Sequence, residues 1–346
     1  MNDASQAAVK IPLNVLTGFL GSGKTTLLKR LLSSDAFANC AVLINELGEI
    51  ALDHDLIDIV DHETVVLSNG CICCGIRSDL ADALLDLNAK RNRGDVPAFD
   101  RVVVETTGLA DPAPVLNTII GHPQLHFHFR VATIVTTVDA LHGLAQLRAH
   151  PESVRQVAVA DRLVITKTDL ADTRAVDDLH AALSDMNPSA TVTTSDGTAQ
   201  EADILVEEDV QASSGTREAK RWFAGRPSAG GDGLFGPDGK RLGPAHATRV
   251  TSVALTFEEP LDWAAFGVWL SMLLHCHGAR ILRMKGILNI SGSSLPTVVH
   301  GVQHLMHPPT HLPRWPDDDH RSRLVLIGDL PSKEALQHSL QAFMTR

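Results

Sequence analysis

The chain has 346 residues, of which 44% are hydrophobic, and its formal net charge is −11. This length and composition suit about two domains with sizeable buried cores. They argue against a nucleic-acid partner, because no run of Lys or Arg is long enough to follow a phosphate backbone. They also argue against a membrane protein, because no apolar run approaches the roughly 20 residues that a spanning helix needs.

Residues 1–6 contain no basic stretch followed by an apolar segment, so the N-terminus lacks the pattern of a signal peptide. We therefore expect a cytoplasmic protein, in which thiols stay reduced. The five cysteines include three within four consecutive residues, Cys71, Cys73 and Cys74. This clustering favours metal or redox chemistry over a disulfide framework. The other two, Cys40 and Cys276, are expected to be packed thiols.

Apolar strand patterns alternate with helical patterns through the first part of the chain. Strands are predicted over 11–16, 41–44, 101–104, 131–138 and 163–165. Leucines recur at helical spacing over 25–32, and an amphipathic helix is predicted over 79–91. This alternation predicts an α/β fold, with a parallel sheet that is covered by helices on both faces.

The regular pattern weakens after about residue 194. Residues 196–247 are rich in Gly, Ser, Asp and Glu and are interpreted as a linker region. Regular patterns return with strands predicted over 248–257, 281–290, 297–302 and 324–327, and with helices predicted over 261–275 and 333–343. We therefore predict a P-loop domain over 1–195, the linker region, and a smaller α+β domain over 248–346.

A phosphate-binding loop follows the first predicted strand. The segment from Gly18 to Thr25 matches Gly-x-x-x-x-Gly-Lys-Ser/Thr and precedes a predicted helix. Its glycines allow backbone N–H groups to turn toward phosphate oxygens. Lys24 would reach the β- and γ-phosphates, and the Thr25 hydroxyl would ligate Mg²⁺.

Glu105 follows a buried strand at the edge where ligands bind in this architecture. An acidic residue there can orient Mg²⁺ or the attacking water, and the N–H of Gly108 can meet a γ-phosphate. The segment Thr166-Lys167-Thr168-Asp169 follows another buried strand. The Asp169 carboxylate can accept two hydrogen bonds from the guanine edge, for which adenine has no matching donors. The Lys167 stem would cover the face of the base.

The segment Cys71-Ile72-Cys73-Cys74 lies between the phosphate loop and Glu105. Thiolates suit Zn²⁺, Cu⁺ and similar ions, and a closed structural zinc site usually has four protein ligands. Only three thiols are local, so either a fourth ligand comes from elsewhere or the site stays open for exchange, as a carrier requires. Structural zinc and buried inert cysteines remain alternatives. Glu46 and Glu49 are candidate further ligands.

Five motifs occur in a fixed order: Gly-Phe-Leu-Gly-Ser-Gly-Lys-Thr-Thr, Asn-Glu-Leu-Gly-Glu, Cys-Ile-Cys-Cys, Glu-Thr-Thr-Gly-Leu-Ala-Asp-Pro and Thr-Lys-Thr-Asp. This set resembles the CobW-type metal-chaperone GTPases, within the class that includes the hydrogenase and urease maturation GTPases. The resemblance extends over nearly the whole chain. It implies a GTP-hydrolysing protein that binds Zn²⁺ or Co²⁺ and delivers it to a client metalloenzyme. The alternative is a GTP-dependent switch with a structural zinc and no metal delivery.

The resemblance also implies roles for individual residues. The catalytic residues would be Lys24 and Glu105. The nucleotide with its Mg²⁺ would be held by Gly18, Gly21, Ser22, Gly23, Lys24, Thr25, Thr26, Gly108, Thr166, Lys167 and Asp169. The Zn²⁺ or Co²⁺ would be carried by Cys71, Cys73 and Cys74, with Glu49 as a candidate further ligand. The expected partner is a client metalloenzyme, and a homodimer is left open.

Two departures from the family pattern matter. Ile44 stands where many relatives have a further Glu, so one acidic metal ligand is missing. Thr166 replaces the commoner Asn of Asn-Lys-x-Asp, and because Thr lacks the amide donors, guanine selectivity is expected to be looser. Turnover without a partner is expected to be slow, because no residue is recognisable as an arginine finger.

Overall fold

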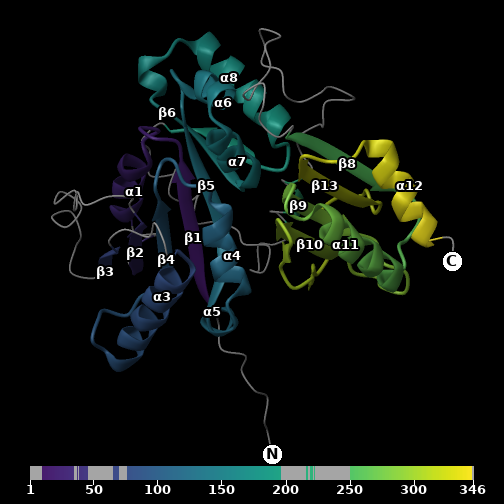
Figure 1. The fold of residues 1–346 in the computed structure, drawn as a ribbon, viewed down its shortest axis with the longest axis horizontal. Coiled ribbons are helices and arrows are strands. Elements are labelled where there is room, and N and C mark those ends of the chain that lie inside the picture. Colours follow the sequence, from purple (N-terminus) through teal and green to yellow (C-terminus); the bar gives the residue numbers. More distant parts are fainter. Residues whose placement is uncertain are drawn as a thin grey trace, which may run out of the picture.

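A computed structural model of the chain describes residues 10–34, 37, 39–45, 65–69, 76–195, 216, 219–220, 222 and 250–344. It contains two sheets, each with its own helices (Figure 1). The first sheet is parallel throughout, with the strand order β3-β2-β4-β1-β5-β6-β7. Its strands are β1 (Ile11–Gly18), β2 (Cys40–Asn45), β3 (Val65–Asn69), β4 (Arg101–Thr106), β5 (Phe129–Asp139), β6 (Arg162–Thr166) and β7 (Thr191–Thr194).

Helices cover both faces of this sheet, as predicted. They are α1 (Lys24–Leu32), α3 (Ile76–Arg93), α4 (Ala113–Gly121), α5 (Pro123–His128), α6 (Gly143–Ala149), α7 (Pro151–Val159) and α8 (Thr173–Met186). Along β4, Val103 packs in the same core cluster as Leu28 of α1, whereas Val102 and Val104 pack in the cluster of α3 and α4. Alternate side chains therefore enter different cores, which explains why the strands are nearly continuous apolar runs.

The second sheet is antiparallel, with the order β11-β10-β9-β13-β8 and with β12 paired to β10. It consists of β8 (Thr251–Phe257), β9 (Ile281–Leu288), β10 (Thr297–Val302), β11 (Leu305–Met306), β12 (Thr310–His311) and β13 (Ser322–Gly328). The helices α11 (Trp263–His277) and α12 (Lys333–Met344) pack on one face, with Phe266, Trp269 and Leu340 in the core. This part confirms the predicted α+β character.

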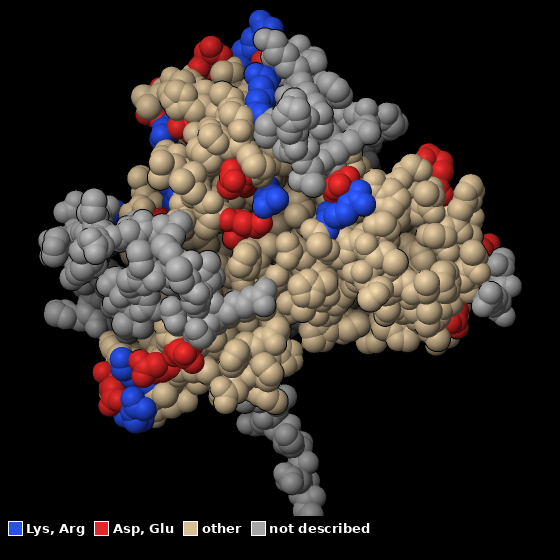
Figure 2. Space-filling model, in the orientation of Figure 1, with Lys and Arg blue, Asp and Glu red and all other residues tan. Residues whose placement is uncertain are grey.

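The face of this second part that Figure 2 shows carries few charges. Helix α11 contains no Lys, Arg, Asp or Glu. In Figure 2, a broad face of the C-terminal part is free of charged side chains, whereas elsewhere Lys and Arg are mixed with Asp and Glu. Cys276, which was expected to be packed, is exposed on α11, so that expectation is wrong. Cys40 is buried as expected, and burial raises the pKa of its thiol to about 12.

The second sheet packs against the first part of the chain. Leu282, Val325 and Ile327 belong to the same core cluster as residues of α7 and β5. Within this apolar contact, the buried Asp161 carboxylate accepts hydrogen bonds from the side chain of Arg283, from Lys285 Nζ at 2.8 Å, and from the backbone of β5. Burial by itself raises the pKa of Asp161, but the two cations outweigh it and hold that pKa well below its usual range.

Two stacked histidines extend this polar contact. The rings of His300 and His307 lie 3.9 Å apart, centroid to centroid, and within 10° of parallel. Burial lowers the pKa of both, that of His307 to about 3, so both are neutral at pH 7. Trp222 also contacts this buried cluster of charged and histidine side chains. The centroid of its ring lies 4.9 Å from Lys285 Nζ.

Trp222 and Ala219 belong to the predicted linker region, yet both are buried against β9 and β10. Most of the remaining linker residues lie outside the described residues, and for them the linker stays a prediction. No helix in the described ranges is long and apolar enough to cross a membrane.

Candidate functional site

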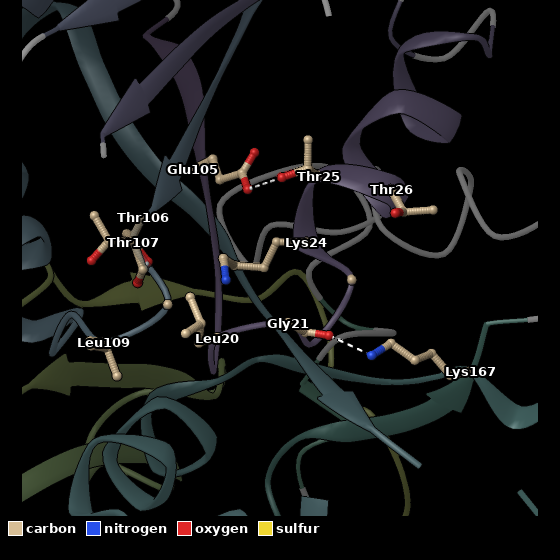
Figure 3. Close-up of a pocket in the computed structure, with 12 residues that line it drawn as sticks. Leu20, Gly21, Lys24, Thr25, Thr26, Glu105, Thr106, Thr107, Leu109 and Lys167 are labelled. Carbon is tan, nitrogen blue, oxygen red and sulfur yellow. Dashed lines mark hydrogen bonds between the residues drawn. The ribbon is translucent and has the colours of Figure 1, made fainter. Parts of the chain in front are cut away.

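A pocket of about 500 Å³ opens at the carboxyl ends of β1 and β4 (Figure 3). It is lined by Leu20, Gly21, Gly23, Lys24, Thr25, Thr26, Glu105, Thr106, Thr107, Gly108, Leu109 and Lys167. The structure therefore brings together most of the residues that the motifs singled out for nucleotide binding. Of the others, Gly18, Ser22 and Thr166 support the phosphate loop, and Asp169 is exposed in the 3₁₀ turn Thr168–Leu170.

The phosphate loop closes over the N-terminus of α1. Ser22 N–H donates to Phe19 O at 3.1 Å, and α1 begins at Lys24 after Gly23, whose φ of 87° is in the left-handed region. Lys24 Nζ donates to Gly18 O at 3.0 Å and to Phe19 O at 3.2 Å. The first-turn N–H groups of a helix attract anions, so this geometry suits a polyphosphate.

Thr25 and Glu105 meet across the pocket. Thr25 Oγ1 donates to Glu105 Oε1 at 2.9 Å, and Glu105 is only 4% exposed (Figure 3). A hydroxyl and a carboxylate at hydrogen-bond distance are hard oxygen donors of the kind that Mg²⁺ prefers. The residues present therefore fit a magnesium ion.

Lys167 bridges two elements at the other end of the pocket. Its backbone is left-handed, with φ 57°, and its Nζ donates to Gly21 O at 2.6 Å and to Asp139 Oδ2 at 2.6 Å. Asp139 Oδ1 accepts from the N–H groups of Leu141 and His142. Burial raises the pKa of Asp139, but these hydrogen bonds outweigh it and the pKa falls below its usual value. Asp139 is thus a rigid anchor for Lys167.

The sequence motifs did not identify Asp139 as a site residue, although its position in the sequence could have done so. It is the last residue of β5, an apolar strand at the ligand edge, as Glu105 follows the apolar run of β4. The same reasoning that singled out Glu105 would have found Asp139.

Thr166 ties the base-side segment to the phosphate loop. Its Oγ1 donates to Ser22 O at 2.7 Å, and Ser22 Oγ lies 2.6 Å from Thr137 Oγ1 of β5. The Thr that replaces Asn at this position therefore makes a direct hydrogen bond to the loop.

The predicted metal ligands Cys71, Cys73, Cys74 and Glu49 lie outside the described residues. The strands that flank them are described. β2 ends at Asn45 and β3 ends at Asn69, and these two residues are paired across the parallel ladder. Asn45 is also paired with Thr106, the neighbour of Glu105 in β4. The strands that precede the Glu49 segment and the cysteine segment therefore both end at the sheet edge that carries Glu105. Within the described ranges, no group of three or more His, Cys, Asp or Glu residues could hold a metal ion.

Known proteins match both parts of the chain. The model of the CobW/HypB/UreG nucleotide-binding domain matches residues 12–194, and that of the cobalamin synthesis protein cobW C-terminal domain matches residues 250–344. The chain is 32% identical to the zinc chaperone YjiA of Escherichia coli, covering 94% of this chain and 96% of that protein. It is 35% identical to the zinc-regulated GTPase metalloprotein activator 1 of Schizosaccharomyces pombe, covering 48% of this chain and 41% of that protein.

A solved structure agrees with these matches over the full length. The crystal structure of Zn(II)-bound YjiA GTPase from E. coli superposes with a TM-score of 0.69 at 26% identity, covering 97% of this chain and 99% of that one. Because one family model matches more than half of the chain and a relative above 30% identity spans nearly all of it, the chain belongs to the CobW family of GTPases.

Proposed function

We propose that the protein is a GTP-dependent metallochaperone that binds Zn²⁺ or Co²⁺ through Cys71, Cys73 and Cys74 and delivers the ion to a client metalloenzyme. One observation carries the proposal: β2, which ends just before the Glu49 segment, pairs with β4, the strand of Glu105, and β3, which ends just before the cysteine segment, pairs with β2 on its other side. A change at the γ-phosphate side of the pocket therefore acts at the edge from which both segments leave the sheet.

The pocket supplies the groups that GTP hydrolysis needs. Lys24 would bind the β- and γ-phosphates, and Thr25 with Glu105 would hold Mg²⁺, which when bound neutralises charge on the β- and γ-phosphate oxygens. Glu105 would also orient the attacking water. No arginine is among the described residues that line the pocket, which supports slow turnover until a client or a second copy of the chain completes the site.

The base side of the pocket supports guanine recognition by Asp169, with Lys167 over the base. Replacing Asp169 with asparagine is expected to shift the preference from GTP toward xanthosine triphosphate, because the Asn amide can donate to the extra carbonyl of xanthine. Competition of the two nucleotides for the wild-type and variant proteins measures the shift. An unchanged preference would remove Asp169 from the base site.

Metal binding and GTP binding should be coupled. Titration of Zn²⁺ and Co²⁺ with and without a non-hydrolysable GTP analogue is expected to show tighter metal binding with the analogue. By reciprocity, the metal should tighten analogue binding by the same factor, typically about 5- to 150-fold in coupled systems. Cys73→Ser is the matched control, since it removes a proposed thiolate ligand and changes none of the described residues that line the nucleotide pocket. Equal metal affinity with and without the analogue would contradict the proposal that GTP controls metal binding.

The names of the relatives support the delivery step. Two of them are a zinc chaperone and a metalloprotein activator, so a client metalloenzyme is the partner that we propose for this chain. A reducing compartment such as the cytoplasm would keep the three thiols available for the ion.

A further inference from the structure

Gln156 on α7 supports the loop that follows Glu105. Its side chain is buried, and its Nε2 donates to Gly108 O at 3.2 Å and to Ala110 O at 3.0 Å. Because both neighbours are carbonyl oxygens, only the NH₂ group can face them, which settles the orientation of the amide. The main-chain carbonyl oxygen of Gln156 accepts from Thr136 Oγ1 at 2.8 Å, so the backbone of Gln156 is held against β5.

Filling space does not explain a glutamine at this position. Its Oε1 is buried and has no hydrogen-bond partner among the described residues. An unpaired buried acceptor opposes folding, whereas an apolar side chain of similar length would fill the same volume without that penalty. What the glutamine adds is its pair of hydrogen bonds to Gly108 and Ala110.

The loop that Gln156 holds is tightly enclosed. A Cβ on Gly108 would lie 2.6 Å from Leu20 Cα and 2.7 Å from Leu20 N, so Gly108 packs directly on the phosphate loop. Figure 3 shows its neighbours Thr107 and Leu109 beside Leu20. Arg155, which precedes Gln156 on α7, pairs with Asp111 at 3.1 Å. The segment is thus fixed between the phosphate loop and two successive side chains of α7.

We propose that Gln156 is a positioning residue for the γ-phosphate of GTP, acting through Gly108 and Ala110 without touching the nucleotide. This inference rests on the proposed meeting of Gly108 with the γ-phosphate. GDP lacks that phosphate, so the Gln156 hydrogen bonds contribute to GTP binding and hydrolysis and not to GDP binding. Gln156 thereby helps the protein to distinguish its two nucleotide states.

The test compares two buried side-chain amides, that of Gln156 on α7 and that of Asn187 at the end of α8. Gln156→Met removes both donors and keeps the length of the side chain. The matched control is Asn187→Leu, because Asn187 Nδ2 also donates to main-chain carbonyls of α7 and its end, those of Val157, Ala158 and Ala160. None of these acceptors lines the nucleotide pocket. Both variants should lower Tm, since each leaves buried carbonyls without donors.

Nucleotide binding should separate the two variants. Gln156→Met is expected to lower kcat and the affinity for a non-hydrolysable GTP analogue, each by about tenfold, because a small misplacement of a positioning group is costly in the transition state. Its GDP affinity should equal that of the wild type. Asn187→Leu should keep the ratio of GTP-analogue to GDP affinity. An unchanged ratio in Gln156→Met, or the same change of ratio in Asn187→Leu, would overturn the inference.

Gly108→Ala separates failure of this inference from failure of the proposed γ-phosphate contact. A Cβ there collides with the backbone of Leu20, so the loop must move. If Gly108→Ala alters the affinity ratio and Gln156→Met does not, the γ-phosphate contact stands and the role of Gln156 falls. If neither substitution alters the ratio, both proposals are wrong.

Discussion

Replacing Asp161 with asparagine is expected to lower the free energy of unfolding by about 3–5 kcal/mol, the usual cost of breaking a buried ion pair by removing one partner. Asp161 faces the side chains of Arg283 and Lys285, which are 3% and 0% exposed. Asparagine is nearly isosteric but neutral, so two buried cations would lose their counter-charge. Urea unfolding followed by circular dichroism measures the loss.

The matched control is Asp329→Asn, which removes the acid of an ion pair at the end of β13 in the second sheet. Asp329 pairs with Arg280 at 2.9 Å, but their side chains are 26% and 47% exposed. An exposed pair of this kind contributes about 1 kcal/mol or less, so the control should unfold almost as the wild type does. Equal losses in the two variants would contradict the view that buried charge joins the two sheets.

The ion pair at Asp161 also shows where sequence reasoning reaches its limit. The strand after Asp161 and the strand of Arg283 were both predicted, because apolar runs are local patterns. Nothing local indicates that Asp161 pairs with residues more than a hundred positions later in the chain. His300 and His307 illustrate the same limit, because their spacing does not predict that their rings stack.

The phosphate loop was predictable because all of its parts are contiguous. Strand, glycines, Lys24 and helix follow one another within one short segment, so the motif carries its own structural context. Asp139 and Gln156 act on that loop and on Gly108 from separate elements. Asp139 could have been found from its position at the end of a strand, whereas Gln156 lies mid-helix and carries no local signal.

Burial was wrongly predicted from the sequence at two places. Trp222 and Ala219 are buried although the segment around them is rich in Gly and polar residues, since a few apolar side chains suffice to pack a segment. Cys276 is exposed, and the sequence did not indicate this, because α11 has no charged residue to mark which of its faces meets solvent. Average composition describes a segment as a whole, and burial is decided residue by residue.

The largest effect on nucleotide binding is expected from Gly18→Ala. A Cβ on Gly18 would lie 2.3 Å from Thr137 Oγ1 and 2.5 Å from Thr137 O, and the backbone φ of +144° already disfavours a side chain. The carbonyl belongs to β5 and cannot rotate away, so the end of β1 must shift and carry the phosphate loop with it. Because displacement by about 1 Å costs roughly a hundredfold in a preorganised site, GTP affinity should fall by about that factor.

Gly21→Ala makes the same chemical change in the same loop without the collision. Gly21 also has a positive φ, +73°, but a Cβ there meets no heavy atom within 4 Å. Its cost is therefore limited to the left-handed backbone, about 1–2 kcal/mol. Titration with a fluorescent GTP analogue, together with Tm, should show a far weaker defect than in Gly18→Ala. Equal defects would mean that backbone conformation, and not the close approach of β1 to β5, sets the shape of the loop.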